Sequence, residues 1–288
     1  MNKVKVIFVC LIFLFISTIL YALDTVKDNT FFGLKKYTQE LKKNVFALQA
    51  EGDLTNKDEN DDYIVLGSGF LIQKNNFVIG ITCKHLVLKN VKIEEGKIKM
   101  QDGKIVLKRP IYIGLDTEDG YRRFKAEVFH IDGQYDFAML LPIKDNPEDQ
   151  IKLKNLVLND SYLGSNDLIV EGKGILIIGY PLGLGVEYNK NSPIVNFGII
   201  SQYKKQENFL IDITVNSGNS GSPVFSLEDG KFVGMITSFT NAQTLLYDQN
   251  GKLVATLPYN SGLANALPVG VIKTKLDELI KATSNKSE

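Results

Sequence analysis

The residue whose neighbours best suit it to chemistry is Ser220, in the stretch 216–225. Gly218 stands two residues before it and Gly221 directly after it, so a tight loop can lift the hydroxyl clear of its own backbone. The same glycines allow successive backbone N–H groups to turn to one side and form an anion-binding concavity. A loop of this composition is more often a plain turn. The nucleophile interpretation therefore depends on whether the rest of the chain supplies a base.

A serine hydroxyl needs a base to take its proton and a third group to orient that base. The sequence has two histidines. His85 follows the apolar run 77–82, where the chain leaves a predicted sheet, whereas His130 lies inside a run of strand type. Asp136 precedes another apolar strand, and an imidazole N–H is the natural partner of a buried carboxylate. We therefore predict that His85, Asp136 and Ser220 act together.

The order His, Asp, Ser resembles that of the chymotrypsin-fold serine peptidases. The motifs that agree in order occupy 67–70, 82–85, 136–140, 178–185, 198–201 and 218–225. Together they are similar to the protease domain of the bacterial HtrA/Deg family. The segments 84–85, 179–181 and 218–225 also resemble the secreted glutamyl endopeptidases. The resemblance covers roughly residues 45 to 275.

This resemblance implies an all-β fold of two antiparallel Greek-key β-barrels, with the site in the groove between them and a short helix at each end. We expect a signal peptide over 1–22, an N-terminal segment and first barrel with His85 and Asp136 over 23–150, and a second barrel with Ser220 and the C-terminal helix over 151–288. HtrA proteins usually continue into a PDZ domain, and no segment of this chain fits one.

The resemblance also implies roles around the nucleophile. The backbone N–H groups of Gly218 and Ser220 would form the oxyanion hole. Phe239 falls where trypsin has a pocket-opening glycine, so its ring should shorten the S1 pocket, and Ile236 replaces the glutamate-reading histidine of the glutamyl endopeptidases. We expect small or medium apolar P1 residues. The predicted substrate-binding residues are Thr214, Asn216, Thr237, Ser238 and Phe239.

Two positions depart from the trypsin pattern. Ser222 stands where trypsin-like and most HtrA enzymes have glycine, although the glutamyl endopeptidases have serine there too. Asn219 replaces the aspartate with which trypsin captures a new N-terminus, so salt-bridge activation is not expected. Serine peptidase activity is the first interpretation. The alternative is a catalytically silent relative that acts in binding or as a chaperone.

Lys3 and Lys5 precede an uncharged run over 6–23 that ends in Tyr21-Ala22, which predicts a signal peptide cleaved after Ala22 and export to the periplasm or beyond. The run is also long enough for an uncleaved membrane anchor. Apart from that anchor we expect no membrane contact. After cleavage Cys83 would be the only cysteine, which excludes an internal disulfide.

The resemblance implies protein or peptide substrates, and a formal net charge of +0 gives no sign of nucleic-acid binding. The acidic stretch 51–62 lacks the ligand spacing of an EF-hand, and Gly183-x-Gly185 opens no helix and lacks the Gly-Lys that a phosphate loop needs. We therefore expect no metal and no cofactor. The HtrA resemblance raises a homotrimer as one assembly, although no trimer contacts are identifiable.

The insertion between His85 and Asp136 contains four predicted strands that we expect to enlarge the first barrel, and the polar segment 144–167 should cross between barrels. Asn250-Gly251 between two apolar runs predicts a hairpin over 244–257. This hairpin either overhangs the cleft or simply extends the second barrel. The predicted strands are 44–50, 63–71, 77–82, 91–94, 97–100, 104–107, 110–115, 175–178, 196–201 and 209–215, and the predicted helices are 31–43 and 271–282.

Overall fold

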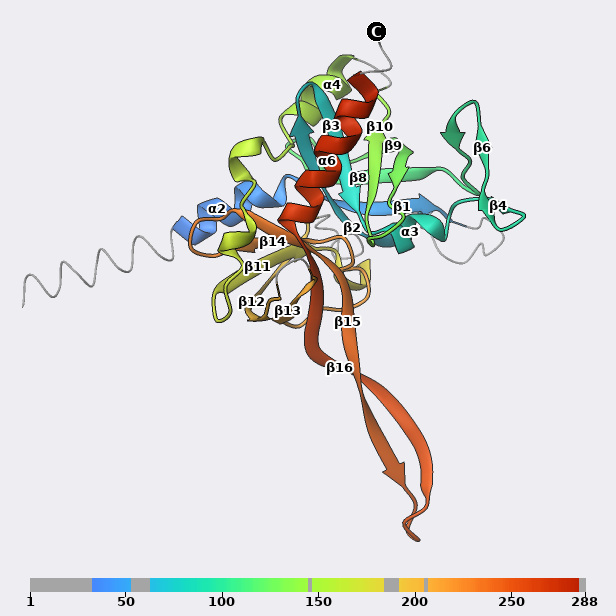
Figure 1. The fold of residues 1–288 in the computed structure, drawn as a ribbon, viewed down its shortest axis with the longest axis vertical. Helices are drawn as coiled ribbons and strands as arrows, with labels where there is room; N and C mark the ends of the chain where they lie inside the picture. The colour runs from blue at the N-terminus through green and yellow to red at the C-terminus, as the bar shows by residue number, and fades with distance from the viewer. Residues whose placement is uncertain (1–32, 53–62, 145–146, 184–191, 205–206, 285–288) are drawn as a thin grey trace, which may run out of the picture. The chain divides into compact units, whose positions relative to one another are not determined.

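The computed structural model describes residues 33–52, 63–144, 147–183, 192–204 and 207–284. Within these ranges the chain forms two closed antiparallel β-barrels of six strands each (Figure 1). The predicted all-β fold of two barrels is therefore confirmed. The predicted leader or anchor, most of the acidic stretch 51–62 and Gly185 lie outside the described residues.

The first barrel brings the ends of two strands together at the place where the site is built. Thr82 at the end of β3 pairs with Ala138 at the start of β10, so the segments that follow and precede them are neighbours. Gly69 on β2 leaves room for the Phe46 ring, which a Cβ there would approach to 2.2 Å. The strands follow the order β1 (Val45–Glu51), β2 (Tyr63–Lys74), β3 (Phe77–Thr82), β10 (Ala138–Pro142), β9 (Gly120–Ile131) and β8 (Ile111–Thr117).

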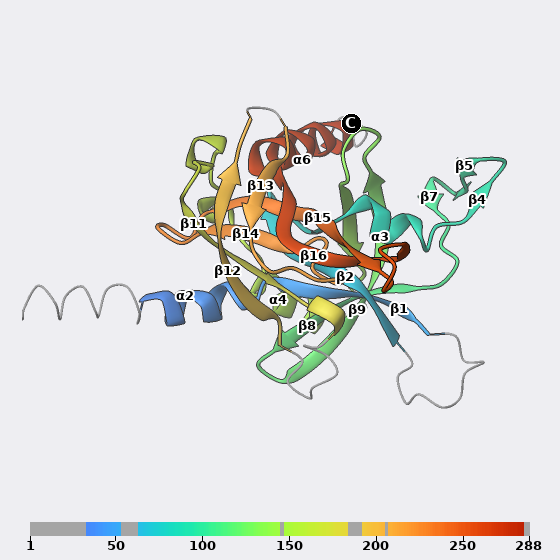
Figure 2. The ribbon, with the colours of Figure 1, turned by 90° about the horizontal axis from the view of Figure 1, so that it is seen from below.

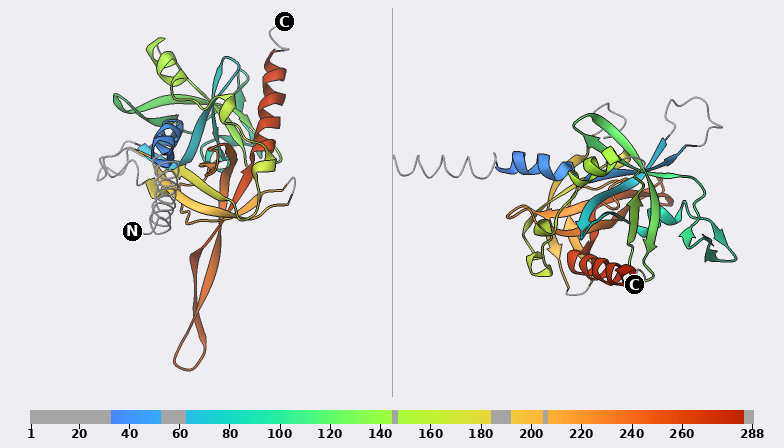
Figure 3. Two further views of the ribbon diagram at one scale, coloured as in Figure 1. Left: turned by 90° about the vertical axis from the view of Figure 1, so that its left-hand side faces the viewer. Right: turned by 90° about the horizontal axis from the view of Figure 1, so that it is seen from above.

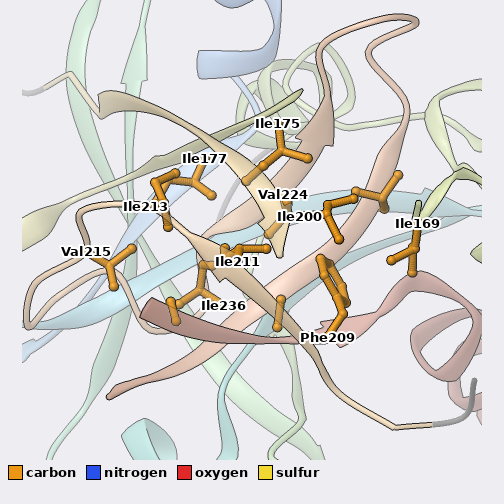
Figure 4. Packing of buried hydrophobic residues seen from close by; sticks show 13 residues of the cluster. Ile169, Ile175, Ile177, Ile200, Phe209, Ile211, Ile213, Val215, Val224 and Ile236 are labelled. Carbon is orange, nitrogen blue, oxygen red and sulfur yellow. The ribbon is translucent and has the colours of Figure 1, made fainter. Parts of the chain in front are cut away.

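The second barrel closes around a mostly aliphatic core that includes Phe209 (Figure 4). Ile175 and Ile177 on one strand, and Ile211 and Ile213 around the end of another, stand two residues apart. Because successive strand residues point to opposite faces, this spacing directs all four side chains inward. The strand order is β11 (Gly174–Gly179), β12 (Ile194–Gln202), β13 (Phe209–Asp212), β16 (Leu253–Pro268), β15 (Phe232–Tyr247) and β14 (Pro223–Ser226).

The insertion after His85 does not enlarge the first barrel, so that prediction is wrong for three of the four strands. β4 (Ile93–Glu94) pairs with β5 (Lys97–Ile98), and β6 (Met100–Gln101) pairs with β7 (Lys104–Ile105), each as a separate two-stranded sheet. Figure 2 shows β4, β5 and β7 standing away from the barrel strands. Ile93 and Met100 are more than half exposed, so these short strands bury too little apolar surface to join a barrel. The fourth predicted strand, 110–115, is β8.

The predicted hairpin forms, and it is longer than expected. β15 and β16 have 16 residues each and remain paired from Gly234–Pro268 near the barrel to Tyr247–Leu253 near the turn. The outer half is not an extension of the barrel, because β14 pairs with β15 only as far as Met235. Figure 1 and the left view of Figure 3 show the hairpin running away from both barrels.

Among the described residues the three longest helices are α2 (Gly33–Lys42), α4 (Pro147–Lys154) and α6 (Val269–Ser284). The segment 144–167, which was predicted to cross between the barrels, contains a helix. Pro147 begins α4 and two acidic residues follow in the first turn, which are favourable at a helix N-terminus. The predicted C-terminal helix is α6, whose Lys275 lies 3.3 Å from the buried Asp132 carboxylate of the first barrel. No helix among the described residues has the length and apolar character to cross a membrane.

Candidate active site

Two of the predicted residues, His85 and Asp136, lie in direct contact. His85 is on the short helix α3 (Lys84–Leu88), directly after β3, and Asp136 is in the turn before β10. His85 Nδ1 lies 2.7 Å from Asp136 Oδ2, and the His85 backbone N–H donates to Asp136 Oδ1 at 2.9 Å. Because the carboxylate accepts both bonds, it fixes the ring orientation and leaves Nε2 free of this partner.

The environment keeps Asp136 ionised. Burial by itself would raise the pKa of this carboxyl. The hydrogen bonds from the ring and backbone of His85, the charge of His85 and a contact with Cys83 outweigh burial and lower the pKa below its ordinary value. Asp136 is therefore a carboxylate at neutral pH, as an orienting group must be.

The other histidine has a different partner. His130 lies on β9, and its Nε2 is 3.7 Å from Asp132 Oδ2. Asp132 also accepts backbone N–H bonds from Gln134 and Tyr135 and an ion pair from Lys275. This arrangement is a structural network around a buried carboxylate. It supports the choice of His85 over His130 as the candidate base.

Ser220 lies in a tight loop between β13 and β14 that only glycine can form at two positions. Gly218 has φ +97° and Gly221 has φ +87°, both in the region that L side chains rarely adopt. A Cβ on Gly218 would lie 2.3 Å from the Tyr180 carbonyl oxygen, and one on Gly221 would lie 1.9 Å from the Ser68 carbonyl oxygen. The loop is thus pressed against both barrels.

Ser68, which the sequence analysis did not single out, ties this loop in place. Its backbone N–H donates to the Ser220 carbonyl at 2.9 Å. Its buried hydroxyl donates to the Gly218 carbonyl at 2.6 Å and accepts from the Tyr180 N–H at 2.8 Å. The one available sequence signal was a hydroxyl residue between two glycines inside an otherwise apolar strand. Ser68 is a positioning residue, since it holds the loop and not the reacting atoms.

The helix of His85 and the loop of Ser220 meet at shared neighbours. A Cβ on Gly67 would lie 2.4 Å from the Leu86 side chain and 3.1 Å from the Ser220 carbonyl oxygen. On the other side, the Cys83 thiol and the Gly221 N–H both donate to the Ile236 carbonyl, at 3.1 and 2.8 Å. Residues flanking His85 therefore contact the same groups as residues flanking Ser220.

The backbone N–H groups on either side of Asn219 differ in their bonding from the other donors at the tip of the loop. Asn219, Gly221 and Ser222 each donate their N–H to a carbonyl, at 3.0, 2.8 and 2.9 Å. In the described part of the chain, the N–H groups of Gly218 and Ser220 donate to no acceptor. Two free N–H groups on either side of one residue are the donors that a developing oxyanion requires.

The predicted substrate-binding residues lie along two segments of the second barrel. Thr237 is buried, and its hydroxyl donates to the Asn265 carbonyl at 3.2 Å, whereas Ser238 is exposed. Phe239 is half-buried and packs against the barrel core. Thr214 is exposed and Asn216 half-buried in the strand-to-loop segment that leads to Ser220.

The same region has the spacing of a metal site, since ligand atoms of Cys83, His85 and Asp136 all lie within 4.8 Å of one another. A cysteine binds metal as a thiolate. Burial and the nearby charge of Asp136 raise the pKa of the Cys83 thiol well above its ordinary value, and the thiol already donates to a carbonyl. The donor set therefore suits a neutral, hydrogen-bonded thiol better than a metal ligand.

Comparisons with known proteins agree with this arrangement. A family model described as "Trypsin-like peptidase domain" matches residues 67–235. A probable periplasmic serine endoprotease DegP-like of Halomonas elongata is 28% identical over 218 residues, which are 74% of this chain and 35% of that protein. A serine protease HtrA-like of Staphylococcus aureus is 25% identical over 237 residues, 75% of this chain and 26% of that protein. The chain thus matches only about a third of the length of these relatives.

Among solved structures, the HtrA-type protease AlgW with decapeptide has a TM-score of 0.51 and 19% identity. The match covers 85% of this chain and 67% of that one. At this identity the likeness supports the fold of two barrels.

Proposed function

Since the chain belongs to the family of trypsin-like peptidases, we propose that it is an exported serine endopeptidase that works through Ser220, His85 and Asp136. Ser220 Oγ attacks the carbonyl carbon of a peptide bond while His85 Nε2 takes its proton. His85 then returns the proton to the leaving amine, and water hydrolyses the acyl-enzyme by the same route. Asp136 holds the imidazole tautomer and stabilises the transient imidazolium.

The observation on which the proposal chiefly rests is the contact of His85 Nδ1 with Asp136 at 2.7 Å. Gly67 is a shared neighbour of Leu86, which follows His85, and of the Ser220 carbonyl. The N–H groups of Gly218 and Ser220, which have no acceptor among the described residues, would be the donors for the oxyanion. Losing one such donor costs about 3 kcal/mol of transition-state stabilisation in other enzymes, so the geometry of the loop, as well as the three side chains, matters to the rate.

Substrate preference is proposed from the segment Thr237, Ser238 and Phe239. The half-buried Phe239 ring occupies space at the wall of the second barrel, which favours small or medium apolar P1 residues over long ones. The exposed Thr214 and the half-buried Asn216 would line the opposite side. A peptide library would show cleavage after such residues; a profile dominated by Arg, Lys or Glu at P1 would refute this preference.

Export is proposed because curated relatives are named periplasmic and because the uncharged run 6–23 follows Lys3 and Lys5. N-terminal sequencing of protein recovered from outside the cytoplasm should begin at Leu23. A retained N-terminus in the membrane fraction would instead indicate an anchor. The homotrimer stays a prediction, which sedimentation of the exported protein would test.

The catalytic proposal is tested by labelling with a fluorescent fluorophosphonate, which reacts only with an activated serine. The wild-type protein should be labelled and should cleave casein, and both properties should disappear in Ser220→Ala and His85→Ala. Asp136→Asn should lower kcat by about 10⁴-fold, because the imidazole loses its productive tautomer. Folded wild-type protein without labelling would establish the silent binding or chaperone-like alternative.

A further inference from the structure

The outer part of β15 has an open edge that begins beside the nucleophile loop. Among the described residues, the backbone hydrogen bonds between this loop and β15 are made at Ile236, which accepts from the Gly221 N–H and donates to the Ser222 carbonyl. β14 pairs with β15 only as far as Met235. Beyond these contacts, the edge of β15 facing away from β16 has no strand partner in the described part of the chain.

We propose that residues 240–247 of this edge form an extended docking strand for the substrate segment on the N-terminal side of the scissile bond. This inference rests on the proposed peptidase function and deepens it. The partner is an extended, uncharged peptide with apolar side chains at alternate positions, held by main-chain hydrogen bonds as an added strand.

Strand direction follows from the ladders already present. β15 pairs antiparallel with both β14 and β16, and it runs from the serine loop toward the hairpin turn. A peptide added antiparallel to it therefore runs from the turn toward Ser220. The peptide residues that lie along the hairpin are then those on the N-terminal side of the bond to be cleaved. At about 3.3 Å per residue, the segment 240–247 spans about 26 Å.

One face of the hairpin supplies the apolar surface for such a peptide. The register places Ala242 opposite Tyr259, Thr244 opposite Leu257 and Leu246 opposite Ala255, so these side chains share a face. Leu246, Leu257 and Tyr259 are 40%, 51% and 53% exposed. The opposite face presents the pairs Gln243–Pro258 and Leu245–Thr256, which are more polar.

The two edges of the hairpin differ in how well they are protected against pairing with another strand. Proteins usually protect exposed strand edges with charges or proline. The β15 edge over 240–247 has neither, whereas the β16 edge contains Pro258. The only charged residues over 240–260 are Asp248 and Lys252, both at the turn. A polar turn argues against insertion into a membrane, and an uncharged edge favours an uncharged peptide.

The base of the hairpin is fastened to the segment that leads to Ser220. The Asn260 side-chain amide donates to the Val215 carbonyl, and the Ser261 hydroxyl donates to the Thr240 carbonyl at 2.6 Å. Asn260 also accepts from the Gly262 N–H at 2.9 Å. A peptide bound along β15 is therefore held at a constant distance from the nucleophile loop.

The test uses peptides with one cleavable core and N-terminal extensions of increasing length, apolar at alternate positions. The hairpin is shortened by replacing residues 242–259 with Asn-Gly, which keeps the Asn241–Asn260 pair. For the wild-type protein, kcat/KM should rise about tenfold or more with the longest extension, a gain of about 1.4 kcal/mol. The shortened protein should show no rise, while its cleavage of the unextended core and its fluorophosphonate labelling stay at the wild-type level.

Point variants give a matched control. Leu246→Asp with Tyr259→Asp charges the apolar face and should abolish the gain from extension. Gln243→Asp with Thr256→Asp adds the same charge to the opposite face, and this variant should retain most of the gain in kcat/KM from the N-terminal extension. An equal gain in all variants, a gain from C-terminal extension only, or a hairpin effect confined to the oligomeric state in sedimentation would overturn the docking strand.

Binding to the Ser220→Ala protein separates this inference from the catalytic one. Fluorescence anisotropy should show the extended peptide binding to the full hairpin and not to the shortened one. Hairpin-dependent binding without fluorophosphonate labelling of the wild-type protein would reject the peptidase and retain the docking strand. Fluorophosphonate labelling without any hairpin-dependent binding, or hairpin-dependent rise in kcat/KM, would retain the peptidase and reject the docking strand.

Discussion

Removal of the Ser68 hydroxyl should destabilise the fold and disable the nucleophile loop together. This buried group donates to the Gly218 carbonyl and accepts from the Tyr180 N–H. Ser68→Ala deprives both backbone groups of these partners at a buried position. At about 1–3 kcal/mol for each buried group left unpaired, the expected loss of unfolding free energy is about 2–6 kcal/mol. A loss of this size lowers Tm by roughly 4 °C or more.

Ser222→Ala is the matched control, since it removes a hydroxyl of equal burial from the same loop. Ser68 and Ser222 are both 0% exposed, but Ser222 Oγ has no hydrogen-bond partner among the described residues. Its removal should be neutral or stabilising, because no bond is lost and an unpaired polar atom leaves the interior.

The assay is urea unfolding of both variants, followed by cleavage kinetics at a temperature where each is folded. Ser68→Ala should also lower kcat by about tenfold or more, because a displaced Gly218 misdirects an oxyanion donor. KM should change less than kcat. If Ser68→Ala and Ser222→Ala have equal unfolding free energies, the assigned role of the Ser68 hydroxyl is wrong.

The remaining predictions concern the same region. Because the pKa of Asp136 is lowered on folding, its contribution to stability is present above the unfolded value of about 4 and is lost as pH falls through the folded value. The stability gap between wild type and Asp136→Asn in urea titrations should therefore be largest near neutral pH and shrink in acid; a gap that grows in acid would contradict the pKa direction. Gly221→Ala should cost about 2 kcal/mol or more, since φ is +87° and its Cβ would lie 1.9 Å from the Ser68 carbonyl oxygen; unchanged thermal stability would refute this. Gly179→Ala should be destabilised by a clash at 1.9 Å with Ser222 Oγ, and adding Ser222→Ala should recover part of the loss, with a coupling of about 0.5–3 kcal/mol in a double-mutant cycle.

The candidate site was partly accessible from residue types and order. His85 was preferred to His130 because it follows a strand, and the structure places His85 against Asp136 and His130 beside Asp132. The role of Ser68 was not accessible. Its hydroxyl acts on a carbonyl 150 positions away, and no local pattern reports on such a contact.

What the sequence left undecided about the fold has the same cause, because it too depends on contacts between distant segments. Alternation over 91–107 predicted strands, and short strands do form, but strand type does not reveal which sheet a segment joins. The segment 144–167 was predicted only as a polar crossover, and it contains α4, since proline is favoured in the first turn of a helix. In both cases the local preference was compatible with two structures, and burial against the rest of the molecule selected one.

Order and alternation along the chain were sufficient to locate individual strands, a glycine-framed serine, a histidine at a strand end and a hairpin at Asn250-Gly251, while the grouping of the strands into two barrels came from the family resemblance. These features depend on backbone angles and on periods of a few residues. Barrel closure, the partners of His85 and Ser68 and the open edge of β15 arise only when distant segments pack together. Hydrogen bonds and burial join groups by distance in space, and separation along the chain does not specify that distance.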